Sequence, residues 1–133
     1  MRAVFDTNIY ISAFAIPGSR VETAIVKVAE GGVQLAISQP IIHEVLDVLA
    51  RKFDRNPEAL ARVAVYLSEL AEVVAPRRRL KVLRDEPDNR ILECAVAAKA
   101  KIIVTGDQAM LALGEYRSIR ILSLKDFLAG IFP

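Results

Sequence analysis

The hydrophobic residues of this chain recur with two different periods. Short apolar runs bounded by turn residues predict β-strands, and longer segments with apolar residues three and four positions apart predict α-helices. The longest helix is expected to start at Pro57, with a seam of apolar residues at positions 60, 63, 67, 70 and 74. In chain order, the expected strands or extended segments are residues 2–6, 33–38, 80–83, 101–105 and 120–122, and the expected helices are residues 21–30, 40–49, 57–74, 85–100 and 124–129.

Strands and helices alternate along the whole sequence, without a linker, a repeat or a low-complexity stretch. Such alternation is typical of a parallel sheet that is covered by helices on both faces. The predicted fold is therefore α/β: a three-layer α/β/α sandwich with a central parallel sheet of four or five strands. A length of 133 residues matches about one ordinary domain, so residues 1–133 are expected to form a single domain.

Composition narrows the class of protein. The hydrophobic content of 53% exceeds the usual value of about 45–50%, which predicts a large core, an apolar surface kept for a partner, or both. The single cysteine, Cys94, excludes an internal disulfide, and its apolar helical context favours a buried thiol. No apolar run approaches the ~20 residues that a membrane span needs, and no signal peptide is visible, so a cytoplasmic protein is expected.

Two aspartates follow predicted strands closely. Asp6 ends the first strand, and Asp107 comes just after the strand of residues 101–105. In an open parallel sheet, sites form beyond the carboxyl ends of the strands, so both carboxylates are expected at one edge if both strands are central. A lone aspartate at a strand end is more often a turn former or a helix cap, but two at matching places favour a site.

Two further acids have alternative interpretations. Asp88 precedes Ile91 and Leu92 by three and four residues, which places it on the buried face of its helix, where a carboxylate needs hydrogen bonds or a cation. It also fits a capping box with Asp85 as the N-cap, and the spacing does not decide between the two. Glu44 comes too late in its helix for capping, and a solvated glutamate is its default interpretation, although its helix starts at the same sheet edge as the strand-end aspartates.

Four carboxylates at one edge would repel one another unless a cation neutralised them. Mg²⁺ and Mn²⁺ suit this role because they prefer hard oxygen ligands, and a bound divalent ion can activate water against a phosphoryl group. Of the 16 acids, 12 remain outside such a site against 18 basic residues, a balance that attracts polyanions. The residues that other kinds of site need are missing. His43 has no second histidine to complete a zinc-protease motif, and the sequence contains neither a GxGxxG motif for dinucleotides nor a P-loop for nucleotide phosphates.

The chain resembles PIN domains at four acidic landmarks, in the family's order and intervals: Asp6-Thr7-Asn8, Glu44, Asp85-Glu86-Pro87-Asp88-Asn89 and Thr105-Gly106-Asp107. The likeness spans nearly the whole chain and is greatest to the PIN toxins of VapC type. It implies an endoribonuclease that cuts single-stranded RNA with Mg²⁺ or Mn²⁺, forms a homodimer and is covered by a cognate antitoxin protein. It further implies that the metal-binding and catalytic acids are Asp6, Glu44, Asp88 and Asp107, supported by Asn8, Thr105 and Asp85.

The sequence leaves alternatives for substrate and activity. The same site is compatible with a DNA-directed nuclease, and a non-catalytic PIN-like module for RNA binding or assembly is a second alternative, although all four acids persist here. The densest basic run is Arg77-Arg78-Arg79. We expect this triplet to contact RNA phosphates, against the alternative of a solvated charged loop.

Overall fold

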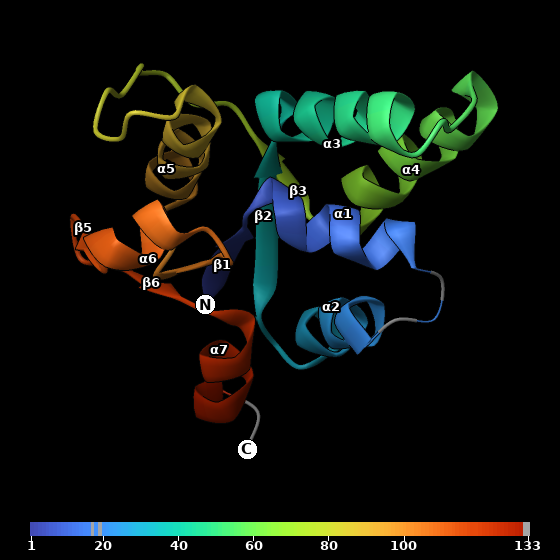
Figure 1. The fold of residues 1–133 in the computed structure, drawn as a ribbon. Coiled ribbons are helices and arrows are strands. Elements are labelled where there is room, and N and C mark those ends of the chain that lie inside the picture. The colour runs from blue at the N-terminus through green and yellow to red at the C-terminus, as the bar shows by residue number, and fades with distance from the viewer. Residues whose placement is uncertain (17, 19, 132–133) are drawn as a thin grey trace.

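The computed structural model describes residues 1–16, 18 and 20–131, and within this part of the chain six strands form one sheet (Figure 1). They are β1 (Arg2–Phe5), β2 (Gln34–Ser38), β3 (Glu72–Val74), β4 (Ile102–Val104), β5 (Glu115–Tyr116) and β6 (Ile119–Leu122). Their spatial order is β3-β2-β1-β4-β6-β5, and each neighbouring pair is parallel except β5 with β6. The predicted α/β class is confirmed, and the sheet is wider than the predicted four or five strands.

Helices cover both faces of this sheet. They are α1 (Thr7–Ala15), α2 (Arg20–Glu30), α3 (Gln39–Lys52), α4 (Pro57–Leu70), α5 (Glu86–Ala98), α6 (Gln108–Leu113) and α7 (Leu124–Ile131). Val4 and Phe5 are consecutive in β1 and therefore point to opposite faces, yet both are fully buried. The Phe5 ring meets Tyr10 of α1 and Phe127 of α7, with ring centroids 5.9 and 6.0 Å apart. Helix α5 packs across β1, β2, β3 and β4, and α3 packs against α4 (Figure 1).

The segment after α4 differs from its prediction. The helix expected to continue to Val74 ends at Leu70, and the next residue, Ala71, is extended with φ −124° and ψ 151°. Residues Glu72–Val74 then form β3 beside β2. Valine is β-branched and fits a strand better than a helix, but its spacing from Leu70 also suits a helical seam, so the hydrophobic pattern alone predicted the wrong element.

Three other regions also depart from the predicted elements. Helix α1 (Thr7–Ala15) is not among the expected helices. Residues 80–83, expected as a short extended strand, join no strand of the described sheet and run beside α5 instead. The hydrophobic pattern does not predict α6 or β5, which are both short. None of the described helices combines the length with the apolar composition that a membrane crossing requires.

Candidate functional site

The strand order reverses between β1 and β4, and this switch point positions the first predicted site residues. From β1 the chain proceeds to β2 and β3 on one side, and it then returns to place β4 and β6 on the other. Phe5 lies beside Val104, so Asp6 and Thr105 leave the two strands together at their carboxyl ends. Ligand-binding crevices of open α/β sheets form at such switch points.

Hydrogen bonds join Asp6 to Asp107 through Thr105. The buried Thr105 hydroxyl donates to Asp6 Oδ2 over 2.6 Å, and its oxygen accepts the backbone N–H of Asp107 over 3.0 Å. Asp107 is the N-cap of α6, where its Oδ2 accepts the N–H of Met110 over 3.0 Å. Thr105 therefore holds both the Asp6 carboxylate and the turn that presents Asp107.

Asp6 is only 5% exposed, and this burial raises the pKa of its carboxyl above the ordinary value of 3.8. The Thr105 hydrogen bond lowers the pKa in part. The backbone N–H groups of Thr7 and Asn8 also lower it, although neither forms a capping hydrogen bond of full geometry with the carboxylate. The negative charge of Asp107 raises the pKa again. Ionised Asp6 is thus costly in the absence of a cation.

Asp88, in the first turn of α5, has a still more perturbed carboxyl. Its pKa is raised to about 7, first by burial and then by the charges of Asp107, Asp6 and Asp85 and a hydrogen bond with Asp107. The Asp85 side chain makes no capping hydrogen bond at the start of α5. The capping box needs a hydrogen bond to the Asp85 side chain, and this bond is missing, so that interpretation is wrong for Asp85. Asp88 lies instead close to the strand-end aspartates, Asp6 and Asp107.

The remaining predicted residues have more open positions. Glu44 of α3 is half-buried and lines a small cavity of about 170 Å³ together with Thr7, which follows the first site aspartate. Asn8 and Asp85 are exposed. The structure therefore brings the three aspartates and Thr105 together and leaves Glu44 at the rim.

The donor chemistry of this group suits a hard divalent cation. Its ligand atoms are carboxylate and hydroxyl oxygens, and a cation would relieve the repulsion that raises the pKa values of Asp6 and Asp88. Within the described residues, no three His, Cys, Asp or Glu side chains are already arranged so that they could hold a metal ion. One oxygen of Asp6 is engaged by Thr105 and one of Asp107 by Met110. A cation would use the remaining carboxylate oxygens and would need side chains to turn toward it.

The sequence model of the PIN domain matches residues 2–109, which are most of the chain. The chain belongs to the PIN domain family. This confirms the resemblance seen at the acidic landmarks, and the matched region contains all four of them, from Asp6 to Asp107. PIN domains are a family of nucleases.

Known proteins resemble this PIN domain in sequence and in fold. The uncharacterized protein MJ1680 of Methanocaldococcus jannaschii is 28% identical over 132 residues, which cover 94% of this chain and 84% of that protein. A chain in the crystal structure of VapBC2 from Rickettsia felis, bound to a DNA fragment from their promoter, has a TM-score of 0.66 at 14% identity, covering 91% of this chain and 97% of its own. A chain in the structure of VapBC-1 from nontypeable Haemophilus influenzae has a TM-score of 0.65 at 16% identity, covering 94% of this chain and 99% of its own. These two structures share the fold of this PIN domain.

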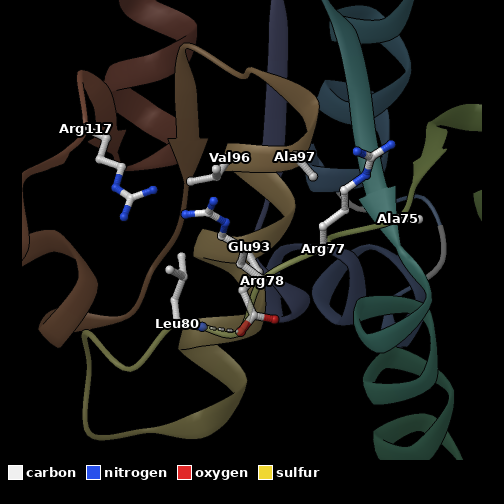
Figure 2. Close-up of a pocket in the computed structure, with 8 residues that line it drawn as sticks. All are labelled: Ala75, Arg77, Arg78, Leu80, Glu93, Val96, Ala97 and Arg117. Carbon is white, nitrogen blue, oxygen red and sulfur yellow. Dashed lines mark hydrogen bonds between the residues drawn. The ribbon is translucent and has the colours of Figure 1, made fainter.

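The predicted RNA-binding triplet lies on the segment of residues 75–85, here called the strap, which joins β3 to α5. Arg77, Arg78 and Arg79 are exposed. Arg77 and Arg78 line two adjoining cavities of about 520 and 400 Å³, and Arg79 lines the larger one. Figure 2 shows that Arg117, from the turn between β5 and β6, faces Arg78 across the smaller cavity.

Two buried polar side chains of α5 hold this strap, and sequence reasoning missed both. Asn89 Oδ1 accepts the N–H groups of Val82 and Leu83 over 3.0 and 2.8 Å, and its Nδ2 donates to the Leu83 carbonyl over 2.8 Å. Glu93 accepts the N–H of Leu80 over 2.8 Å (Figure 2). The available signal was a pair of polar residues four positions apart, next to the apolar residues Leu92 and Cys94 of the same helix, because a buried amide or carboxylate must find partners.

Proposed function

We propose that this PIN domain is a divalent-metal-dependent endoribonuclease that cleaves single-stranded RNA. The observation that carries the proposal is the group of Asp6, Asp88 and Asp107 at the switch point of the sheet, where burial and neighbouring charges raise the pKa of Asp88 to about 7. Carboxyls perturbed by both burial and specific charged partners are typical of functional sites. Family membership supports nuclease chemistry at this group.

The three aspartates are proposed to hold Mg²⁺ or Mn²⁺, with Glu44 adding a carboxylate from the rim. Such an ion, when bound, supplies an activated water and stabilises charge on a phosphoryl oxygen. Thr105 keeps the Asp6 carboxylate oriented and holds the turn that carries Asp107. Asn8 and Asp85 are proposed as polar support beside these acids, Asn8 through its backbone N–H and Asp85 through its charge near Asp88.

RNA is the proposed substrate because the resemblance to VapC-type PIN domains implies it, and the exposed arginines near the site suit a polyanion. Arg77, Arg78 and Arg79 are exposed on the strap and line its cavities, where they are available to phosphates. Neutralising all three is expected to weaken RNA binding by a similar factor for different RNA sequences. The slope of log affinity against log salt concentration should become shallower by about 0.7 for each phosphate that the protein no longer contacts. An unchanged slope would assign the triplet to a solvated loop.

We further propose that the chain acts in the cytoplasm as the toxin of a toxin–antitoxin pair and forms a homodimer. The shared fold with chains of two VapBC structures supports a protein antitoxin as the partner. The apolar seam of α4 is one surface on which a second copy could pack, but it packs largely within the domain: Leu67 is fully buried, and Leu60, Val63 and Leu70 pack against the core. Val65 and Tyr66 remain exposed on the same helix, and light scattering at micromolar concentration tests whether they meet a second copy.

The experiment that tests the nuclease proposal is cleavage of labelled single-stranded RNA in Mg²⁺ or Mn²⁺, with EDTA as the metal-free arm and single-stranded DNA as the alternative substrate. Asp6→Asn is expected to abolish cleavage while the protein stays folded. Asp47→Asn is the matched control, because Asp47 is an exposed aspartate of α3 paired with Arg51. Full activity of Asp6→Asn, or equal activity in EDTA, would remove the site assignment.

A further inference from the structure

Three cavities that share lining residues follow one another from the neighbourhood of the acidic site to the strap. The inner cavity, of about 170 Å³, is lined by Thr7 and Pro87, which adjoin two of the site aspartates in sequence. It shares Arg90 with the middle cavity of about 520 Å³. The middle cavity in turn shares Arg77 and Arg78 with the outer cavity of about 400 Å³. We call the middle and outer cavities together the arginine groove.

The arginine groove carries positive charge that the protein does not neutralise. Its charged lining consists of one acid, Glu93, and of Arg77, Arg78, Arg79, Arg90 and Arg117. Glu93 Oε2 is already engaged, because it accepts from Arg90 Nη2 over 3.0 Å and from the Leu80 N–H over 2.8 Å. In the described part of the chain, the other four arginines make no ion pair with an acid. A concave surface of this kind attracts polyanions.

Both walls of the groove are held in place. Asn89 and Glu93 fix the strap against α5, as described above. On the opposite wall, Arg117 and Ser118 form the two-residue turn between β5 and β6, with φ values of 48° and 67°. Such turns favour Asn and Gly, and other residues adopt the left-handed conformation at a cost that is often found at functional positions. The turn sets the Arg117 guanidinium 5.2 Å from the Tyr116 ring centroid, facing the outer cavity (Figure 2).

Arg90 stands between the groove and the acidic site. Its side chain is 15% exposed, and its Nη2 bonds to Glu86 over 3.2 Å and to Glu93 over 3.0 Å. Its Nε is buried and has no hydrogen-bond partner within the described residues. A buried N–H of a cation is costly unless an acceptor meets it. Arg90 lines both the inner and the middle cavity, so this cation lies where an anionic group would pass between them.

From these observations we infer that the arginine groove is the track for the RNA backbone on one side of the cleaved bond, with Arg90 at its entrance and Arg117 at its far end. The inference rests on the proposed function and extends it to a defined path. From Asp88 to Ala97, α5 rises about 13 Å at about 1.5 Å per residue. A stacked strand advances about 3.4 Å per nucleotide, so the track holds about four nucleotides beyond the acidic site.

The test measures RNA affinity against RNA length. Fluorescence anisotropy is recorded in Mg²⁺ with labelled oligoadenylates, which stack, of about four and about twelve nucleotides, so that one is shorter and the other longer than the site and the track together. The protein carries Asp6→Asn, which is expected to prevent cleavage, either alone or combined with Arg117→Gln. Loss of Arg117 is expected to lower the affinity for the longer RNA by roughly three- to fivefold, and so to reduce the ratio of the affinity for the longer RNA to the affinity for the shorter one. The slope of log affinity against log salt concentration should also become shallower by about 0.7. Arg78→Gln is expected to act in the same direction.

Matched variants separate this track from a general effect of charge. Arg62→Gln removes an exposed arginine of α4 outside the groove, and the ratio of long to short affinity should not change. Arg117→Lys retains the charge and should recover most of the affinity. If Arg117→Gln and Arg62→Gln behave alike, the track is wrong, whereas RNA cleavage by the wild-type protein would still support the proposed nuclease. A wild-type protein that fails to cleave RNA with metal overturns the proposed function instead.

Discussion

Replacing Asp88 with asparagine is expected to stabilise the metal-free protein above neutral pH. The native state holds a proton on Asp88 up to a pKa of about 7, whereas the unfolded chain releases it near 3.8. The folded protein therefore binds more protons than the unfolded chain between these values, and its stability falls as pH rises through this window. Above it, ionised Asp88 opposes the fold, and a neutral amide at this position removes the opposition.

The magnitude follows from the gap between the two pKa values. At about 1.4 kcal/mol per pKa unit, the gap corresponds to an upper limit of roughly 4 kcal/mol. Water at the sheet edge screens part of the effect, so we expect about 2 kcal/mol at pH 8.5 and little difference at pH 4. For a domain of this size, about 2 kcal/mol corresponds to a rise in Tm of roughly 6–10 °C.

The assay is thermal unfolding in EDTA at pH 4 and pH 8.5, because a bound metal would mask the repulsion. Asp85→Asn is the control: Asp85 is an exposed carboxylate three residues earlier in the chain, and only a small rise in Tm is expected from it. The reasoning fails if Asp88→Asn changes the free energy of unfolding equally at both pH values, or if it destabilises the protein at pH 8.5.

Three further predictions test the surroundings of the site. Asn89→Ala removes three hydrogen bonds to the strap and should cost about 2–3 kcal/mol in urea unfolding; a loss below about 0.5 kcal/mol would mean that the strap is held otherwise. Thr105→Val removes the bond that lowers the pKa of Asp6, so the acidic limb of the pH–rate profile should move to higher pH, and an unmoved limb would contradict the role of Thr105. Burial raises the pKa of Cys94 to about 12, so a thiol reagent should modify it only as fast as the protein unfolds, and faster labelling would show an accessible thiolate.

The position of the acidic site could be predicted because it depends on topology. Strand-to-helix alternation indicated a parallel sheet, and in such a sheet Asp6 and Asp107 fall at one edge if their strands are central. The structure makes β1 and β4 neighbours, with Phe5 beside Val104. The burial of Asp88 also followed from its place on the apolar face of its helix. Each of these inferences used only local information: the residue at which a strand ends, or the spacing of apolar residues along a helix.

The surroundings of the site could not be predicted, because they depend on contacts between segments without a periodic pattern. The strap of residues 75–85 has no regular structure, and its path is set by Asn89 and Glu93 from another element. Arg117 reaches the same groove from a turn that follows the last acidic landmark in the chain. The choice between a helix and a strand at Val74 likewise depends on pairing with β2, which local spacing does not encode.

The central claim is that Asp6, Asp88 and Asp107 together hold a divalent metal ion. A crystal of the wild-type protein soaked in Mn²⁺ tests it most directly, through anomalous density at the switch point of the sheet. We predict one strong peak within bonding distance of carboxylate oxygens from at least two of the three aspartates, and its loss in Asp88→Asn. Saturating Mn²⁺ that leaves this edge empty, or that binds only at other surface acids, would contradict the account.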